Sequence, residues 1–468
     1  MNEHYDLIVL GGGASAFAAA IQANELKKKT ALINGGLPAG GTCVNVGCVP
    51  SKLLLHAGEV MHMAKHHGVP GIELEVKSFD FSAVIKDELA MVEGFRKDKY
   101  TKVLAGLEHA TYIEGEASFS SAHEVTVGDK TLTAEAFIIA TGSKATVPPI
   151  EGIHEVGYIT HVEALALKKQ PQELVVVGAG PVGLEFAQLY ARFGTKVTLL
   201  QSRERIFPHG EAELTARLAE LLTKEGITIE TSVSVTRARK EGGKKVLTYI
   251  KEGEEKEIAA DEILLAAGKT ANTEALHLER PGVAVSKRGE VIVNGNFQTN
   301  VPSIYAVGDV TNLPLRLETT AGHEGTLAAE NALAGAKNSI DYSSVPYAIF
   351  TDPGYASVGL TEDAQMERDG VCACRTVPFE VIPKASIVRR TEGLIKMGIH
   401  PKTRVILGVH ILAPNAADLI AQAMVLIKNK NTIDDVLEME PVFPTLSEAI
   451  KYAALSFTRD ISQLSCCV

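Results

Sequence analysis

Four cysteines form two pairs whose spacing suits redox or metal chemistry. Cys43 and Cys48 lie five positions apart in a glycine-rich segment, residues 40–52, and Cys466 and Cys467 are adjacent near the C-terminus. The first pair can close a small disulfide ring and reopen it, and a helix beginning there would favour a thiolate. Neighbouring Cα atoms lie about 3.8 Å apart, so an oxidised adjacent pair is strained, whereas two adjacent thiols suit capture of a soft metal ion. A purely structural disulfide is the alternative for the first pair.

The first cysteine pair follows a strand–turn–helix–strand unit that occurs twice. Apolar strands at 5–10 and 174–177 each run into a glycine turn, an Ala-containing helix and another strand, at 30–33 and 196–200. This βαβ pattern lets backbone N–H groups approach a pyrophosphate at a helix N-terminus. The turn residues expected there are Gly11, Gly13, Ala14, Ser15 and Ala16 in the first unit, and Gly178, Gly180 and Gly183 in the second. Two tight turns without any ligand are the alternative.

Each unit has a later strand that ends in a further glycine turn. These strands end at Thr141 and Gly142 in the first unit and at Gly268 in the second. Two dinucleotide sites imply two bound dinucleotides, and a hydride relay between a nicotinamide and a flavin is the simplest use of them.

The residue that ends the second strand of each unit bears on which dinucleotide binds. Asn34 stands where an acidic ribose ligand is usual, and its side chain can still hydrogen-bond a hydroxyl. Gln201 stands at the matching place of the second unit, followed closely by Arg203 and Arg205. The missing carboxylate and two guanidiniums favour NADPH over NADH. Two solvated surface arginines are the alternative.

The last part of the chain has a different character. From about residue 342, strand-like segments at 348–351, 394–398 and 405–411 precede two expected helices, 416–429 and 446–457. The predicted fold class is α/β, with two Rossmann-like dinucleotide-binding domains and a C-terminal α+β domain.

Charge and hydropathy exclude several classes of partner. Lys and Arg number 46 and Asp and Glu 57, so the formal charge is −11, and no basic stripe is present to bind nucleic acid. No apolar run is long enough for a membrane span, and the first apolar stretch lacks the basic flank of a signal peptide. We therefore expect a cytoplasmic protein without nucleic-acid or membrane partners.

Three segments together resemble the pyridine nucleotide–disulfide oxidoreductases, which include glutathione reductase, dihydrolipoamide dehydrogenase and mercuric reductase. They are Gly-Gly-Thr-Cys-Val-Asn-Val-Gly-Cys-Val-Pro-Ser-Lys at 40–52, Tyr-Ala-Val-Gly-Asp at 305–309 and Phe-Thr-Asp-Pro-Gly-Tyr-Ala-Ser-Val-Gly at 350–359. The likeness covers essentially the whole chain. It implies that FAD binds the first unit and that this flavin exchanges electrons with the first cysteine pair.

The resemblance also assigns roles to individual residues. It implies that Cys48 is the flavin-proximal thiol and Cys43 the exchanging one. Lys52 is then expected near flavin N5, paired with Glu185, which also borders the nicotinamide site. The remaining expected FAD ligands are Gly41, Thr42 and, on the ribityl chain, Asp309.

Two features favour the mercuric reductases within this family. Disulfide reductases carry an acid/base histidine where this chain has Phe443, and a phenyl ring transfers no proton. The terminal pair Cys466–Cys467 resembles the one with which mercuric reductases capture Hg(II) before passing it to the inner pair, here Cys43 and Cys48. Tyr100 falls where one of that family's two metal-path tyrosines is expected, although an ordinary helix position is equally compatible; the other matches Phe443.

The resemblance implies a domain order and a homodimer. We expect an FAD domain at 1–148 and 269–340, an NADPH domain at 149–268 and an interface domain at 341–468. The tail of one subunit then reaches the cysteine pair of the other. The chain starts at the flavin strand, so the extra N-terminal metal-binding domain of many mercuric reductases is expected to be missing.

Two alternative functions stay open on the sequence. A thioredoxin-reductase-like enzyme would use Cys466 and Cys467 to pass electrons to a protein disulfide. A non-catalytic protein that sequesters soft metals would explain the cysteines but neither glycine motif.

Two further clusters contain residue types that can bind metals. His62 and His66 share a helix face, and we expect solvated histidines rather than a metal site. Cys372 and Cys374 alternate on an expected strand, so both side chains point to one side. We expect free cysteines there, and an accessory thiol site is the alternative.

Overall fold

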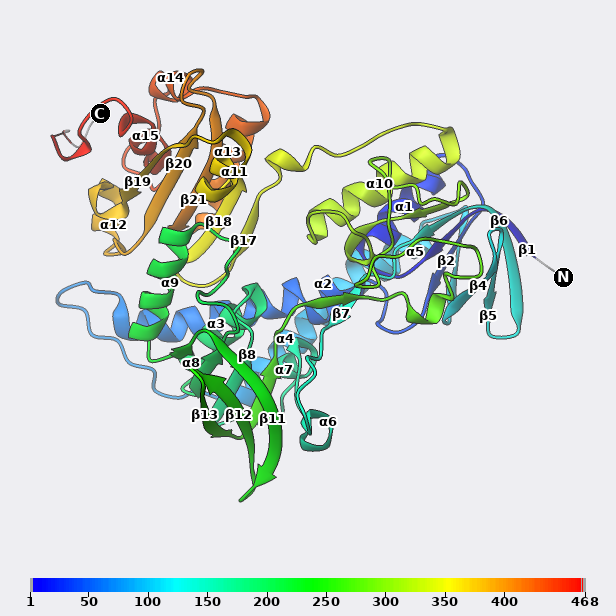
Figure 1. The fold of residues 1–468 in the computed structure, drawn as a ribbon, viewed down its shortest axis with the longest axis horizontal. Helices are drawn as coiled ribbons and strands as arrows, with labels where there is room; N and C mark the ends of the chain where they lie inside the picture. The colour runs from blue at the N-terminus through cyan, green and yellow to red at the C-terminus, as the bar shows by residue number, and fades with distance from the viewer. Residues whose placement is uncertain (1–2, 464, 466–468) are drawn as a thin grey trace.

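A mixed sheet near the N-terminus, parallel except where β5 pairs with β4 and β6, carries the first glycine turn. The computed structural model describes residues 3–463 and 465, and Figure 1 gives their arrangement. The strands lie in the order β3-β2-β1-β6-β5-β4, and β16 pairs with β6 on a separate branch. Their bounds are β1 Glu3–Leu10, β2 Thr30–Asn34, β3 Ala110–Glu114, β4 Ala117–Ser121, β5 Glu124–Val127, β6 Lys130–Ile139 and β16 Ile304–Ala306.

Two helices cover one face of this sheet. α1 (Ala14–Glu25) and α10 (Glu318–Ala334) lie side by side over it (Figure 1). The alternation of a strand explains the two layers, because Leu7 and Val9 face these helices while Ile8 faces the core under β4 and β5. A Cβ at Gly325 would lie 2.1 Å from the backbone oxygen of Ser15, so glycine sets how closely the helices approach.

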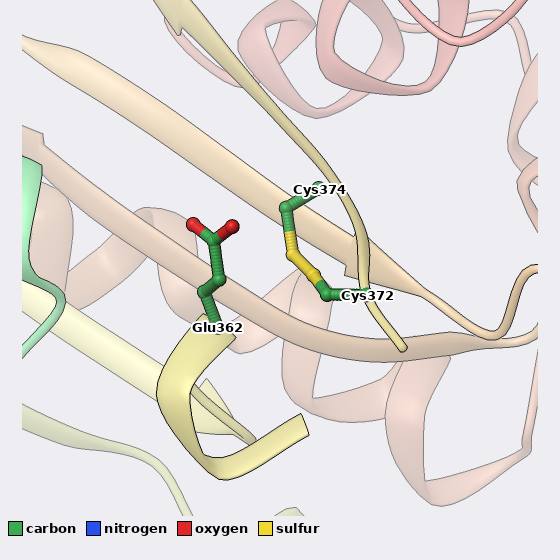
Figure 2. Close-up of side chains that lie close together, drawn as sticks. All are labelled: Glu362, Cys372 and Cys374. Atoms are coloured by element: carbon green, nitrogen blue, oxygen red, sulfur yellow. A yellow bond between two sulfur atoms is a disulfide. The ribbon is translucent and has the colours of Figure 1, made fainter. Parts of the chain in front are cut away.

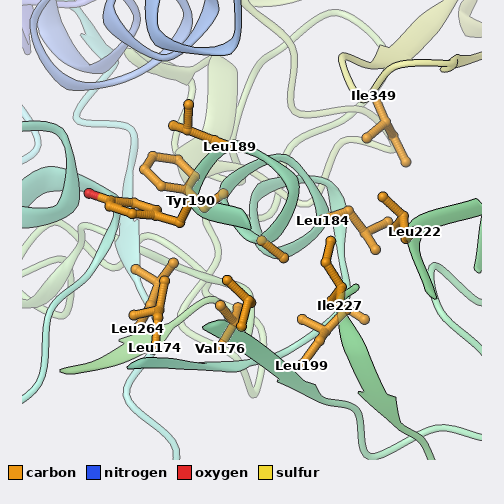
Figure 3. Packing of buried hydrophobic residues seen from close by; sticks show 14 of the residues in the cluster. Leu174, Val176, Leu184, Leu189, Tyr190, Leu199, Leu222, Ile227, Leu264 and Ile349 are labelled. Atoms are coloured by element: carbon orange, nitrogen blue, oxygen red, sulfur yellow. The ribbon is translucent and has the colours of Figure 1, made fainter. Parts of the chain in front are cut away.

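The second unit forms a smaller parallel sheet with an antiparallel sheet beside it. The order of the first is β10-β9-β8-β14 and of the second β11-β12-β13. Leucines and Val176 of the strands pack against Leu184, Leu189 and Tyr190 of the helix above them (Figure 3). The bounds are β8 Glu173–Val177, α8 Pro181–Arg192, β9 Lys196–Leu200, α9 Ala212–Lys224, β10 Thr228–Glu230, β11 Val233–Glu241, β12 Lys244–Lys251, β13 Glu254–Ala260 and β14 Glu262–Leu265.

A five-stranded antiparallel sheet with helices forms the C-terminal part. Its order is β17-β18-β21-β20-β19, which leaves β19 at one edge. Ile349 of β17 also packs into the core around α8 (Figure 3), which joins this part to the second unit. The bounds are β17 Tyr347–Ile349, β18 Gly354–Gly359, α11 Glu362–Asp369, β19 Ala373–Pro378, α12 Pro383–Ile387, β20 Leu394–Ile399, β21 Ile406–Ala413, α13 Ala416–Lys428, α14 Ile433–Leu437 and α15 Glu448–Leu455.

Helices after β2 connect these parts. Leu54 of α3 packs into the same core as α8, so α3 lies between the two dinucleotide-binding units. The bounds are α2 Gly41–Val46, α3 Cys48–His66, α4 Phe81–Arg96, a π-helical turn Lys97–Thr101 and α5 Lys102–Ala105. The short elements are β7 Ser143–Ala145, α6 Ile153–Val156, α7 His161–Leu165, β15 Lys269–Ala271 and 3-10 turns at Glu274–Leu276, Gly308–Val310, Tyr342–Ser344, Phe379–Val381 and Ile461–Gln463.

The predicted fold class is confirmed, with two Rossmann-like units and an α+β part. One prediction was wrong: Cys372 and Cys374 are not free but form a disulfide with Cα atoms 5.8 Å apart. The expected alternation explains this, because cysteines two positions apart in extended chain point to the same side and bring their sulfurs together. Within the described part of the chain, no helix combines the length and apolarity that a membrane crossing needs.

Candidate active site

The Cys43 and Cys48 thiols lie at the junction of two short helical segments. Cys43 is in α2 and Cys48 is the first residue of α3, with Gly47 between them. A Cβ at Gly47 would lie 2.8 Å from the Thr42 carbonyl oxygen, so the turn that brings the cysteines together needs glycine. Both are free thiols, with Cys43 half-buried and Cys48 exposed.

A hydrogen bond between the two thiols shifts their pKa values in opposite directions. This bond and the Lys52 ammonium lower the pKa of the Cys48 thiol, against the effect of desolvation. The same bond, together with burial, raises the pKa of Cys43. Cys48 is therefore the thiol that ionises first, with Cys43 as its donor.

Lys52 is held beside Cys48 by a carboxylate from the second unit. Its Nζ lies 2.8 Å from Oε2 of Glu185 in α8, whose side chain is 7% exposed. The other oxygen of Glu185 accepts a hydrogen bond from the Phe350 backbone N–H at 2.9 Å. The ammonium also lies 4.5 Å from the centre of the Phe350 ring. One buried carboxylate thus ties the thiol helix to the strand region that begins the C-terminal part.

Glu318 is a member of the site that sequence reasoning missed. It begins α10 and hydrogen-bonds the Cys43 thiol, so the Cys43 proton has two acceptors within reach. Burial raises the pKa of Glu318. No motif surrounds this residue, and only the packing of α10 against α1 brings it to the cysteines.

Tyr100 lies in the same cluster, on the π-helical turn. Its half-buried ring meets Phe17 edge-on with centroids 4.9 Å apart. Burial raises the pKa of Tyr100 to about 12, and the charges of Glu318 and both thiols add to this shift. The structure therefore places Tyr100 beside the thiols and packs it against a core residue at the same time.

Lys269 is a second charged residue that the sequence reasoning missed. Burial lowers the pKa of this lysine, while its interactions with Asp309 and Cys48 oppose that effect. It gives the thiol region a second cation besides Lys52.

The first glycine turn has the shape of a pyrophosphate cradle. α1 begins after Gly13 with no side-chain cap and no acid in its first turn, which leaves the N–H groups of Ala14, Ser15 and Ala16 at an open helix end. A Cβ at Gly11 would lie 2.2 Å from the Ala140 oxygen, so only glycine fits. Gly41 lies directly against Gly13, and a Cβ there would come within 2.6 Å of it.

Side chains at the edge of this turn complete a fit for FAD. Asn34 donates both amide hydrogens within the protein, to Leu37 and Tyr112, so its carbonyl oxygen is the group available to a ribose hydroxyl. Asp309 lies at the far side and accepts a hydrogen bond from Ser143 at 2.7 Å. The Thr141 hydroxyl is bonded to the Asn272 backbone, which fixes the turn before Gly142. Thr42 follows Gly41 in α2.

The second glycine turn has the same construction. α8 begins after Gly180, again without a side-chain cap, and a Cβ on Gly180 would meet no atom within 4 Å. A Cβ at Gly183 would lie 1.9 Å from the Gly178 oxygen, so the helix and the turn touch through glycine. Gly268 follows β14 with a positive φ of 110°. These residues fit a second dinucleotide.

Of the three residues after β9 that could contact a dinucleotide phosphate, two already bind the loop backbone. Gln201 is buried and bonded to the loop backbone, with Nε2 on the Arg205 carbonyl at 3.2 Å. Arg205 is half-buried and donates to the Pro208 carbonyl at 2.6 Å, whereas Arg203 is exposed. Arg203 is thus the guanidinium better placed to meet a phosphate in solvent.

Other predicted residues are not brought into the site. Cys466 and Cys467 lie outside the described residues. Phe443 is 48% exposed on the C-terminal part. The rings of His62 and His66 stack at 4.2 Å and border a cavity of about 480 Å³ between α3, α8 and α9, away from the thiols.

Comparisons with known proteins agree with this construction. Residues 5–334 match the pyridine nucleotide-disulphide oxidoreductase family and residues 345–454 its dimerisation domain. Mercuric reductase of Streptomyces lividans is 40% identical, over 99% of this chain and 98% of its own, and that of Staphylococcus aureus is 38% identical, over 99% and 84%. Mitochondrial dihydrolipoyl dehydrogenase of Pisum sativum is 35% identical, over 97% and 92%. A solved structure, the Cu(II) complex of the HOCl-induced flavoprotein disulfide reductase RclA from Escherichia coli, superposes with a TM-score of 0.87 at 27% identity, covering 98% of this chain and all of that one.

Proposed function

Because the chain belongs to the pyridine nucleotide–disulphide oxidoreductase family, we propose that it is a mercuric reductase that uses NADPH and FAD to reduce Hg(II) to elemental mercury. The observation that carries this proposal is a dithiol site whose expected histidine is replaced by Phe443. Reduction of an organic disulfide needs a proton donor for the leaving thiol, whereas reduction of Hg(II) needs thiolate ligands and two electrons. The mercuric reductases among the relatives support the same assignment.

Each thiol of the inner pair has a distinct part in this proposal. Bound FAD supplies the two-electron transfer between the nicotinamide and the dithiol. Cys48, stabilised as a thiolate by Cys43 and Lys52, provides the sulfur that faces the flavin. Cys43 exchanges with the incoming metal, and Glu318 accepts the proton that Cys43 loses when it becomes a ligand. Glu185 holds Lys52 in position and does not itself react.

We place the entry of the metal at the partner subunit's tail. Cys466 and Cys467 take Hg(II) from a small thiol complex and pass it by ligand exchange to Cys43 and Cys48 of the other subunit. The dimerisation domain supports a homodimer, and in Figure 1 α15, the last helix before the tail, lies at the opposite end of the chain from the sheet that carries α1. Tyr100 borders the path beside the inner pair.

The cofactor preference is part of the proposal. We assign the 2′-phosphate of NADPH to Arg203 first and Arg205 second. Arg203→Ala is expected to raise KM for NADPH by roughly tenfold, the worth of one charge-assisted contact, and to leave KM for NADH unchanged.

The experiment is an assay of NADPH oxidation at micromolar Hg(II) with excess small thiol, while volatile mercury is trapped. One elemental mercury per NADPH supports the proposal, and its loss in the Cys466→Ala/Cys467→Ala variant supports the entry site. Brisk turnover on a disulfide without mercury vapour would overturn it. That result favours the second candidate, a disulfide reductase, which the dihydrolipoyl dehydrogenase and RclA matches keep in view.

A further inference from the structure

The disulfide between Cys372 and Cys374 lies at the edge of the five-stranded sheet, in a different part of the protein from both glycine turns. Cys374 is on β19, the edge strand of the five-stranded sheet, and Cys372 directly precedes this strand. Both are half-buried, and Figure 2 shows the bridge facing the carboxylate of Glu362 at the start of α11. Among residues 3–463 and 465, these three form the one group of His, Cys, Asp or Glu whose ligand atoms all lie within 4.8 Å of one another.

A buried amide oxygen also faces the two sulfurs. Gln365 is 1% exposed, and its Oε1 lies 3.7 Å from the Cys372 sulfur and 4.0 Å from that of Cys374. Its Nε2 donates to the Leu360 carbonyl at 3.1 Å, which fixes the direction of the oxygen. Gly398 of the neighbouring strand leaves space for the Gln365 side chain, because a Cβ at Gly398 would lie 2.0 Å from Nε2 of Gln365. Thiols can donate to the oxygen, and a disulfide cannot, so the position of Gln365 is complementary to the reduced pair.

The charged side chains around Lys396 and Glu362 favour binding of a cation beside Cys372 and Cys374. Lys396 is 4% exposed on its side chain and contacts three carboxylates, those of Glu211 at 2.9 Å, Glu213 at 3.5 Å and Glu362. Three carboxylates against one ammonium leave excess negative charge in this cluster, and another cation beside the pair is the exposed Arg375, which donates to the Cys374 carbonyl at 3.1 Å. Burial lowers the pKa of the adjacent His410, so this imidazole adds no compensating charge.

We propose that Cys372, Cys374 and Glu362 form a second metal site, which binds a soft divalent cation of the zinc group through two thiolates and one carboxylate and is closed by the disulfide. A small dithiol opens the site: it gives two electrons and two protons to the disulfide and becomes oxidised itself. The cation then displaces both thiol protons, and the two thiolates, the carboxylate and one further oxygen complete four-coordination. The proposal is independent of the mercuric reductase assignment, because it uses neither Cys43 nor Cys48.

Cadmium binding to the full chain tests this site. The background carries serine at Cys43, Cys48, Cys466 and Cys467, so that only the edge-strand pair can supply thiolates. After reduction with a small dithiol and its removal, we expect one Cd(II) per chain by equilibrium dialysis, with a thiolate-to-cadmium ultraviolet band. Before reduction, and in the background that also carries Cys372→Ser, we expect neither.

A matched pair of variants tests the carboxylate. Glu362→Gln is expected to weaken Cd(II) binding by at least about tenfold, the lower end of what loss of a supporting residue costs a metal site. The control is Asp363→Asn, whose parent side chain is 84% exposed on the same helix turn and which should bind as the background does. Retained flavin absorbance and circular dichroism show that each variant is folded. Equal binding before and after reduction, or equal affinity in the two variants, would overturn the proposal.

Discussion

The Glu185 carboxylate holds the Lys52 ammonium at 2.8 Å across the boundary between the two dinucleotide-binding units. The lysine side chain is 33% exposed and the glutamate 7%, so the pair is largely removed from water. The second carboxylate oxygen of Glu185 accepts a hydrogen bond from the Phe350 backbone N–H. This carboxylate therefore connects three segments that are far apart in sequence.

Glu185→Gln should therefore lower the stability of the protein. The amide keeps an acceptor for Phe350 but leaves Lys52 without its counter-ion, at a cost of about 1–3 kcal/mol in the free energy of unfolding. Denaturant titration measures that loss. The control is Glu274→Gln, which removes the exposed pair with Lys144 and should leave the unfolding midpoint unchanged. Equal midpoints in the two variants would contradict this connecting role.

The hydrogen bond between the two thiols predicts effects of different size from two substitutions of Cys43. Cys43→Ala removes the donor to Cys48, so the pKa of the Cys48 thiol should rise, whereas Cys43→Ser retains a donor and should raise it less. Thiolate absorbance as a function of pH measures both, in protein that carries serine at Cys466 and Cys467. Identical titration curves would mean that the bond does not set the acidity of Cys48.

Glu318 supplies a third test of the thiol cluster. Its charge raises the pKa of both thiols, so Glu318→Gln should shift both thiolate titrations to lower pH. At the same time the Cys43 proton loses one of its two acceptors, and the rate of metal exchange onto Cys43 should fall by about 100-fold, the lower end of what a proton-transfer group contributes. Thiolate titration and stopped-flow exchange separate the two effects. A faster exchange in the variant would show that Glu318 acts only as a repelling charge.

The sequence predicted the parts of this site that depend on local geometry. Gly11, Gly178 and Gly183 are required by close backbone contacts within a few residues of a strand end, so their pattern is visible in the chain. Glu318 was not visible, because its approach to Cys43 depends on how α10 packs on α1. The antiparallel sheet of β11, β12 and β13 was missed because β11 and β13 carry many charged residues, which hides the apolar positions that pack into a shared core, among them Val233, Leu247 and Ala260. The bridge between Cys372 and Cys374 was missed because spacing fixes the side of a strand but not the redox state.

A buried carboxyl outside the site gives the protein a pH-dependent stability. Glu88 is 1% exposed in α4, its Oε2 has no hydrogen-bond partner within the described chain, and burial raises its pKa from 4.5 to about 7. Between these values the folded state retains a proton that the unfolded state loses, so stability falls as pH rises from about 4.5 to 7. The difference amounts to about 3 kcal/mol.

Glu88→Gln should remove this slope. At about pH 3.5, below both pKa values, the variant and the parent should be equally stable, and at pH 8 the variant should be more stable by about 3 kcal/mol, because the amide is never charged. Denaturation curves at several pH values measure this, with Asp87→Asn on the exposed face of the same helix as control. A constant offset between variant and parent across the pH range would show that Glu88 is ionised in the folded protein.

Substitution of Phe443 should change which class of substrate, Hg(II) or a disulfide, the protein reduces. The residues after it retain a structured turn: Glu448 is 4% exposed and accepts a hydrogen bond from the Thr445 N–H at 2.8 Å, so the backbone beside position 443 is held in place. In the proposed homodimer, Phe443→His of one subunit adds a proton donor to the dithiol site of the other. We expect disulfide reduction to rise by about 100-fold, the low end of what general acid catalysis contributes. Phe443→Leu is the matched control and should show no gain. NADPH oxidation with a small disulfide and with Hg(II), followed in parallel, measures both activities. If the histidine raises mercury turnover and leaves the disulfide unreduced, the ring at position 443 limits access of the metal and does not decide between the substrate classes.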